Sequence, residues 1–379
     1  MKQGILLIAG HIKPHTIPLE ERQERGSTMY TRFTRLPLAL ITAALLFVGC
    51  GSSAVNITPT ATPLRPGEFS VYAKNPVIPH GVSTAWAARY VDPGAMIYHD
   101  GAFHMFFNGI NGFPATISVG YATSPDGYAW SLASKDPVFT SDRVKYAQAG
   151  AFMSSVLVGD DGTWTLYFYT TDLAAHAHSV IGRATAPKPT GPWTPDAAPV
   201  LTQGAAGSWD AYSVSHPSVL HTSAGYVMYY SAAATDSDPH NAIGMATSAD
   251  GIHWTKRHDP VLNAGTGDAW DNQIIFDPNV VQTPNGYVMA YLGLGPNGVV
   301  PKPFAAFGYA TSADGVTWTK SSANPVLSTL DHENWQFMFL GNLLYQNGTL
   351  FLYFDLQQQS KTFGVTDVFL ATHPGLLSS

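Results

Sequence analysis

Three titratable residues stand directly before a proline at the start of a strand-like run: Asp92 in VDPG, His216 in SHPS and Asp277 in FDPN. Carboxyl groups that face a common space can act as general acid, general base or nucleophile, which is the chemistry that cleaves a glycosidic bond. Such side chains have a structural alternative, because they can also hydrogen-bond the backbone at a strand start. His216 could likewise be a satisfied core histidine, a ligand of sugar hydroxyls or a ligand of a channel cation.

A second series, aromatic and acidic, precedes these runs. It comprises Trp86, Trp209, Asp210, Trp270, Asp271, Glu333 and Trp335. Indole rings can stack on sugar rings and carboxylates can bind sugar hydroxyls, so we expect this series to contact substrate. The structural alternatives are loop caps for Asp210 and Asp271 and a solvated loop for Glu333. The histidines and aspartates of the intervening loops lack the close spacing of metal ligands, so we predict no metal site and no cofactor.

The elements that position these residues are indicated by an internal repeat. The phrase ATSPDGYAW at 122–130 returns as ATSADGIHW at 246–254 and as ATSADGVTW at 310–318. A degenerate copy, RATAPKPTGPW, ends at Trp193, and the four tryptophans are 63, 61 and 64 residues apart. A period of this length indicates an array of supersecondary units.

Each unit contains four strand-like runs separated by glycine turns, of which Asp-Gly is a strong hairpin signal. Five such units predict an all-β fold, a five-bladed β-propeller, in which the repeated tryptophans are packing residues. The fifth unit stops at 369–375 without its fourth strand, while NPVI at 75–78 matches NPVL at 324–327. We therefore expect the N-terminal segment to supply the last strand of blade five and to close the ring.

The segment YVDPGAMIYHDGAFHMFFNG at 90–109 resembles the first blade of the five-bladed glycoside hydrolases of family 43 and of the invertase-like family 32. The resemblance implies that Asp92 is the first-blade carboxylate, a general base in family 43 and a nucleophile in family 32. Phe276-Asp277-Pro278 is similar to the Arg-Asp-Pro phrase of family 32, with Phe in place of Arg. Family 43 has its acid, a Glu, on the blade where this chain has His216. Glu333 and Asp277 are therefore the candidate proton donors, followed by Asp210 and Asp271.

Residues 1–49 read as a targeting segment rather than as part of the fold. After an upstream extension, the chain from Met29 resembles a bacterial lipoprotein signal: two arginines, an apolar run and the pair Gly49-Cys50. We predict that Cys50, the one cysteine in the sequence, is lipidated; the alternative is a buried thiol. Residues 50–68 are then a lipidated tether rich in Ser, Thr and Pro, and residues 69–379 form the propeller.

The net charge of the protein limits the kinds of partner that we expect. The formal net charge is −7, and removal of residues 1–49 leaves 13 Lys and Arg against 23 Asp and Glu, a formal −10. Nucleic acid requires a basic footprint, so we predict no nucleic-acid partner. We expect an extracytoplasmic monomer that is anchored to the membrane by lipid and binds a carbohydrate.

Two functions remain open at this point. The first is an exported glycoside hydrolase that acts on a neutral oligosaccharide or polysaccharide through carboxylates of the central funnel. The second is a carbohydrate-binding surface lipoprotein whose propeller has lost its catalytic acid. A sialidase is a third function, less favoured than the other two. The turns of sialidases resemble SADGxxW, but a sialidase needs a cluster of arginines for its substrate carboxylate. Arg89, Arg143, Arg183 and Arg257 follow no phase of the repeat. Fold resemblance alone does not decide among them.

Overall fold

The computed structural model describes residues 67–112, 116–147, 150–171, 178–235, 242–295, 305–330, 332–359, 364–375 and 377. The export signal, Cys50 and most of the tether lie outside these ranges, so the domain boundaries and the lipidation stay predictions. Within the described ranges, no helix is long and apolar enough to cross a membrane.

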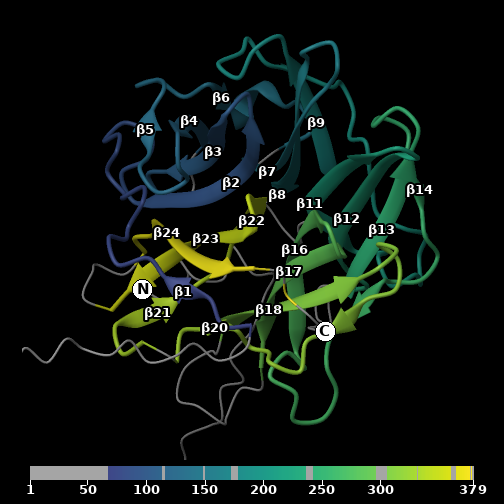
Figure 1. Ribbon diagram of the computed structural model, residues 1–379. Coiled ribbons are helices and arrows are strands. Elements are labelled where there is room, and N and C mark those ends of the chain that lie inside the picture. Colours follow the sequence, from purple (N-terminus) through teal and green to yellow (C-terminus); the bar gives the residue numbers. More distant parts are fainter. Residues whose placement is uncertain are drawn as a thin grey trace, which may run out of the picture. The chain divides into compact units, whose positions relative to one another are not determined.

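The described residues form a five-bladed β-propeller, which confirms the architecture predicted from the repeat (Figure 1). Blade one contains β2 (Tyr90–His99), β3 (Ala102–Ile110), β4 (Ser118–Ser124), β5 (Ser131–Leu132) and β6 (Phe139–Thr140). Blade two contains β7 (Gly150–Val158), β8 (Trp164–Thr171), β9 (Ile181–Ala186) and β10 (Thr194–Pro195). Blade three contains β11 (Ser213–Thr222), β12 (Gly225–Ala233), β13 (Ala242–Ser248), β14 (Thr255–Lys256) and β15 (Leu262–Asn263).

Blade four contains β16 (Ile274–Thr283), β17 (Gly286–Leu294), β18 (Ala305–Ser312), β19 (Thr319–Lys320) and β20 (Leu327–Ser328). Blade five contains β21 (Trp335–Phe337), β22 (Gly341–Gln346), β23 (Thr349–Gln358), β24 (Asp367–Pro374) and, from the other end of the chain, β1 (Ser70–Val71). A single 3-10 turn at Ser141–Arg143 is the other regular element in the described ranges. The inner strands β2, β7, β11, β16 and β22 contact one another in this order, and β22 contacts β2, so they surround the centre of the ring.

The repeated ATS phrase forms the turn after the third strand of a blade. In blade one, Ser124 Oγ and Asp126 Oδ1 accept backbone N–H groups of the turn, and Gly127 has a φ of 79° that favours glycine. The Trp130 indole N–H donates to the Gly127 carbonyl, which also accepts the hydroxyl of Tyr353 from blade five. The turn therefore joins neighbouring blades, and the prediction that the repeated tryptophans are packing residues is confirmed for Trp130.

The N-terminal segment closes the ring, as predicted. Strand β1 pairs antiparallel with β24, and Ile78 forms a further bridge with Val368. The Asn75 side chain donates to the Leu370 carbonyl and accepts its N–H, at 2.9 and 2.8 Å. Asn324 makes the same pair of hydrogen bonds to Tyr309 in blade four. The phrase Asn-Pro-Val thus attaches the outer strand to the third strand in both blades.

The hydrophobic core lies between the faces of neighbouring blades. Between blades one and two, for example, Phe106 packs edge-on against Trp164 and Trp193, with ring centroids 6.0 and 5.6 Å apart. Large buried aromatic rings supply most of this apolar area, at about 25 cal/mol for each Å² removed from water. Because these contacts hold the blades rigidly, the inner strands present their side chains at fixed positions around the channel.

Candidate active site

The structure places Asp277 and His216 at equivalent positions of the ring and Asp92 one residue away. In blade one Asp92 pairs with Asn108, whereas Phe276 is the residue paired at that level in blade four. Asp277 and His216 share a left-handed backbone, with φ of 54° and 50°, at the irregularity of β16 and β11. The proline that follows each of the three residues therefore does not mark the same structural position in blade one. The segment from Asp92 to the following hairpin turn is one residue longer than the segments from Asp277 and from His216 to theirs.

The left-handed backbone at Asp277 and His216 is unusual for residues with a side chain. Such strain costs on the order of 1–3 kcal/mol and persists where the surrounding structure enforces it, often at a functional site. Here the Asp277 N–H donates to Ser231 Oγ of the preceding blade at 2.9 Å. Asp277 Oδ2 accepts the Gly341 N–H of the following blade at 2.6 Å. These two bonds direct the Asp277 carboxyl group across the junction of three blades.

Asp92 is buried beside a second acid, Asp355 of β23. One Asp92 oxygen accepts a hydrogen bond of 2.9 Å from Thr366 Oγ1. One Asp355 oxygen accepts the backbone N–H groups of Phe339 and Leu340, at 2.7 and 2.8 Å.

The two acids ionise in sequence. Burial raises the pKa of Asp355 to about 6, against the opposing effect of its two backbone donors. Burial raises the pKa of Asp92 well above its usual range, and the negative charge of Asp355 raises it further. Because the N–H groups stabilise the charge on Asp355, that residue ionises before Asp92.

Asp277 retains its proton at neutral pH. Burial raises its pKa to about 8; the Gly341 N–H opposes this shift and the charge of Asp355 adds to it. The site therefore combines a proton donor, Asp277, with Asp355, a carboxyl group that is ionised near neutral pH. An acid and a base in one site are what hydrolysis of a glycosidic bond requires.

Tyr169 of β8 lies near all three acids. Burial raises the pKa of its hydroxyl well above the usual range, and the next causes are the charges of three acids: Asp277, Asp92 and Asp355. These charges act on one hydroxyl only because all three carboxyl groups lie near it. Among the described residues, the Tyr169 hydroxyl has no hydrogen-bond partner.

His216 lies against Tyr169, with ring centroids 4.2 Å apart, and edge-on to Phe276 at 5.5 Å. Burial lowers its pKa to about 3, so the imidazole is neutral over the physiological range. Its Nδ1 lies 2.8 Å from Ser215 Oγ. The structure thus brings His216 to the same site as Asp92 and Asp277, as a neutral hydrogen-bonding group beside an aromatic wall.

Sequence reasoning missed Asp355, although a signal was present. The second strands of the five blades read FHMFFNG, WTLYFYT, YVMYYSA, YVMAYLG and LFLYFDL. Their sixth letters are Asn108, Tyr169, Ser231, Leu292 and Asp355, which stand at one level of the ring. An acid in an apolar central strand is rarely buried without a reason. Comparison of the second strands, rather than of the Asp-Pro phrases, locates both Asp355 and Tyr169.

Polar side chains join the inner strands slightly further along the channel. Ser155 Oγ accepts the Val219 N–H, and Ser218 Oγ accepts the Val280 N–H, each at 3.0 Å. Asn342 donates to the carbonyl of Gly94 at 2.7 Å. These bonds connect blades two with three, three with four, and five with one, so they fix the walls that carry the acids.

The tryptophans of the upstream series pack against the second strands of their blades. Each indole lies over one ring: Trp86 over Phe107, Trp209 over Tyr230, Trp270 over Tyr291 and Trp335 over Phe354, with centroids 5.5–6.0 Å apart. The third strand carries glycine beside these rings because a Cβ there would collide, as at Gly120 with Phe107. This packing gives the four tryptophans a structural role, and their contact with substrate stays a prediction.

Asp210 and Asp271 are bound by lysines of their own blades. Lys256 Nζ lies 2.6 Å from Asp210, and Lys320 Nζ lies 2.6 Å from Asp271. Both carboxylates are buried, and each ammonium also lies near a tyrosine ring. The pairs account for the burial of both acids, so the geometry favours the structural alternative over substrate binding.

Glu333 is exposed on the segment that precedes β21. None of the interactions among the described residues connects it to Asp92, Asp277 or Asp355, and its role as proton donor stays a prediction. The loops between second and third strands include 113–115, 172–177, 236–241, 296–304 and 360–363, which lie outside the described ranges. In the part of the chain that is described, no cluster of three His, Cys, Asp or Glu side chains could hold a metal ion.

Residues 84–271 match the family model of the glycosyl hydrolases family 32 N-terminal domain. This match spans blades one to three and slightly less than half of the chain. No curated protein sequence matches the chain.

Several solved structures with a similar fold are described as glycoside hydrolases. A glycosyl hydrolase from Bacteroides ovatus has a TM-score of 0.60 at 17% identity, over 83% of this chain and 97% of that one. The same four values describe a structure from the GH130 family of mannoside phosphorylases, which contains glycoside hydrolases that target β-1,2 mannosidic linkages in Candida mannan. A thermostable family-43 glycoside hydrolase has a TM-score of 0.56 at 16% identity, over 74% of this chain and 88% of that one. The chain therefore has a propeller fold of the glycoside hydrolase type.

Proposed function

We propose that this protein is a glycoside hydrolase that acts on a neutral oligosaccharide or polysaccharide at the channel cluster of Asp92, Asp277 and Asp355. The observation that carries the proposal is the burial of three carboxyl groups at one end of the channel, where Asp277 and Asp355 accept the N–H groups of the adjacent residues Gly341 and Leu340. Each of these groups is buried to 3% exposure, which is costly for an acid that serves only to hold the backbone. Perturbed acids that share a cleft are characteristic of catalytic sites.

In the proposed reaction, Asp277 donates its proton to the glycosidic oxygen as the bond to the anomeric carbon breaks. The negative charge of Asp355, beside Asp92, stabilises the positive charge that develops on the sugar. Water adds directly to the anomeric carbon and its proton passes to Asp355, or a covalent intermediate first forms on Asp92. In the second case Asp355 takes the Asp92 proton as the ester forms, and the proton of the water later passes to Asp277. The Tyr169 hydroxyl and the neutral His216 are placed to bind hydroxyl groups of the same sugar.

The test is hydrolysis of a panel of aryl glycosides and of plant and microbial polysaccharides. With any substrate found, kcat/KM should depend on pH as a bell, rising through about 6 as Asp355 ionises and falling through about 8 as Asp277 loses its proton. Asp92→Asn, Asp277→Asn and Asp355→Asn should each lower kcat at least about a hundredfold in a folded protein. Asp142→Asn, at an exposed site, is the control.

Full activity in Asp92→Asn would refute the assigned chemistry. Sugar binding without turnover across the whole panel would instead identify a carbohydrate-binding protein on a glycosidase fold.

We also propose that the protein is exported and anchored through Cys50, on the strength of the apolar run that ends at Gly49-Cys50. Lipidation adds about 0.8 kcal/mol of membrane affinity for each buried CH₂, so two or more acyl chains hold a protein at a membrane.

A further inference from the structure

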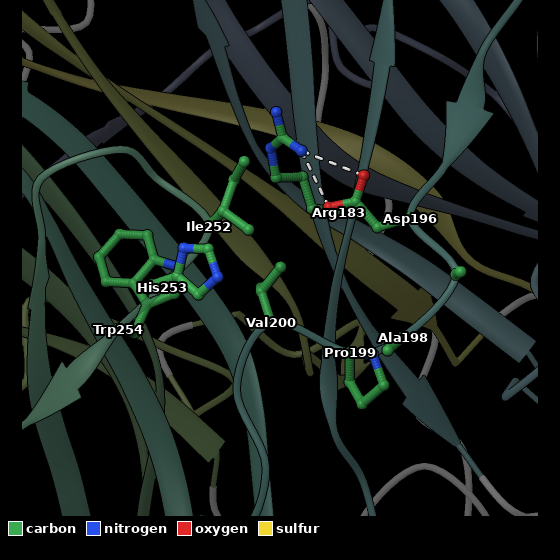
Figure 2. Close-up of a pocket in the computed structure, with 9 residues that line it drawn as sticks. Arg183, Asp196, Ala198, Pro199, Val200, Ile252, His253 and Trp254 are labelled. Carbon is green, nitrogen blue, oxygen red and sulfur yellow. Dashed lines mark hydrogen bonds and ion pairs between the residues drawn. The ribbon is translucent and has the colours of Figure 1, made fainter.

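A cavity of about 570 Å³ lies between the outer parts of blades two and three, and no inner strand contributes to its lining. Arg183 of β9 and Asp196, which follows β10, form one side, and the turn residues Ile252, His253 and Trp254 form the other (Figure 2). The connecting residues 197–200 complete it. The volume falls within the range of small-ligand sites, which are mostly apolar with a few placed polar groups.

Arg183 and Asp196 depart from the repeat at this place. The Asp196 N–H donates to the Arg183 carbonyl at 2.9 Å, and three other blades make the same backbone bond. The corresponding pairs are Tyr121 with Ala133, Met245 with Arg257, and Tyr309 with Ser321. Blade packing is thus satisfied without an ion pair. In blade two, Arg183 Nη1 donates to both oxygens of Asp196, at 3.0 and 2.8 Å, and both side chains remain partly exposed.

Trp254, on the opposite side, is a second departure. Trp130 and Trp318 each donate their indole N–H at 3.2 Å to the glycine carbonyl of their own turn. The Trp254 N–H is buried without a hydrogen-bond partner, so the indole is not fixed by that bond. The cavity is therefore lined by an aromatic residue on one side and by a guanidinium–carboxylate pair on the other.

From these features we propose that the cavity binds a neutral carbohydrate chain at a site separate from the channel. Sugar hydroxyls both donate and accept hydrogen bonds, which matches a paired guanidinium and carboxylate. The apolar face of a sugar ring fits against Trp254 and Pro199. Asp196 neutralises Arg183, and the protein carries a formal charge of −7, so the cavity lacks the positive charge that a phosphate or a uronic acid needs. Binding here does not depend on cleavage in the channel.

Affinity electrophoresis of the full chain tests this site, in native gels that contain inulin, arabinan, arabinoxylan or yeast mannan. The wild type should be retarded by at least one of these polysaccharides, and the channel variant Asp355→Asn should be retarded equally. The double variant Arg183→Tyr/Asp196→Ala recreates the pair Tyr121 and Ala133 of blade one, so it should fold. Its retardation should fall about tenfold, as expected for lost hydrogen bonds to the ligand.

Two single variants complete the design. His253→Ala removes a lining side chain that is 86% exposed and should weaken retardation without affecting folding. Arg257→Ala, at the position in blade three that matches Asp196, should bind as the wild type does. The proposal is overturned if no polysaccharide retards the wild type, or if the double variant, with an unchanged melting temperature, is retarded fully. Loss of retardation in Asp355→Asn alone would assign the binding to the channel instead.

Discussion

Asp277 keeps its proton because its carboxyl group is buried, receives one N–H bond and lies near the charge of Asp355. This state affects the stability of the fold as well as its chemistry. The folded protein binds the proton up to about pH 8, whereas the unfolded chain releases it near 3.8. Between these values the folded state holds more protons, so the free energy of unfolding falls as pH rises, by up to about 1.4 kcal/mol per pH unit.

Asp277→Asn should therefore stabilise the protein relative to the wild type, by an amount that grows from pH 4 to about pH 8 and then levels off. Asparagine keeps an acceptor for the Gly341 N–H and tolerates the left-handed backbone. Urea unfolding at several pH values measures the difference, with Asp142→Asn as the matched control. If the difference in the free energy of unfolding between variant and wild type stays constant from pH 4 to about pH 8, the pKa of Asp277 is not raised in the folded protein.

The candidate site was only partly predictable at the level of residues. Asp92, His216 and Asp277 were located because each precedes proline in an inner strand. Asp355 was missed because it stands in a second strand, whereas the Asp-Pro and His-Pro phrases mark inner strands only. The roles of the other candidate residues depend on contacts that no sequence motif encodes. Asp210, for example, lies 2.6 Å from Lys256, which favours an ion pair over a contact with a sugar.

Among the elements, the outer strand of blade five is the one made from a distant part of the sequence. Its attachment begins with β1, which has two residues, and continues through further bonds to β24 from Tyr72, Asn75, Val77, Ile78 and His80. The matching phrases at 75–78 and 324–327 predicted this closure correctly. The exact pairing followed from the structure, because Ser70 and Val71, not 75–78 alone, form the strand.

Asn75→Ala should lower the stability of the protein by about 1–3 kcal/mol, since it leaves the N–H and carbonyl of Leu370 without their side-chain partners. Thermal unfolding of the variant and of Lys74→Ala, at the exposed neighbouring position, measures this effect. Deletion of residues 68–80 should lower the melting temperature further. An unchanged melting temperature in both the variant and the deletion would refute a stabilising role for this segment.

At the scale of the whole molecule, the repeat was the strongest signal in the sequence. A period of 61 to 64 residues led directly to five blades, because each blade must bury both faces against its neighbours. Function does not follow from this scale, since one fold serves several reactions. The proposed membrane location rests instead on the segment before the propeller, where a single cysteine ends an apolar run.

Cys50→Ser should release the protein from the membrane fraction or block its processing, because the serine hydroxyl cannot carry the thioether-linked lipid. Fractionation of cells that express the wild type or the variant, followed by detection of the propeller, measures the distribution. Ser52→Ala, in the adjacent tether, is the control and should remain with the membranes. Equal recovery of wild type and variant in the soluble fraction would rule out the anchor.

The joining of β1 to β24 also determines the order in which the molecule can be completed. A ribosome makes residues 70–78 before any blade and makes Asp367–Pro374 last. Until those final residues emerge, the first segment has no partner and blade five has no outer strand, although the four earlier blades are already available to fold. A chain that terminates before β24 therefore leaves two unpaired edges, one at each end, which invite association with other chains. The ring can therefore close only after the polypeptide has been synthesised through β24.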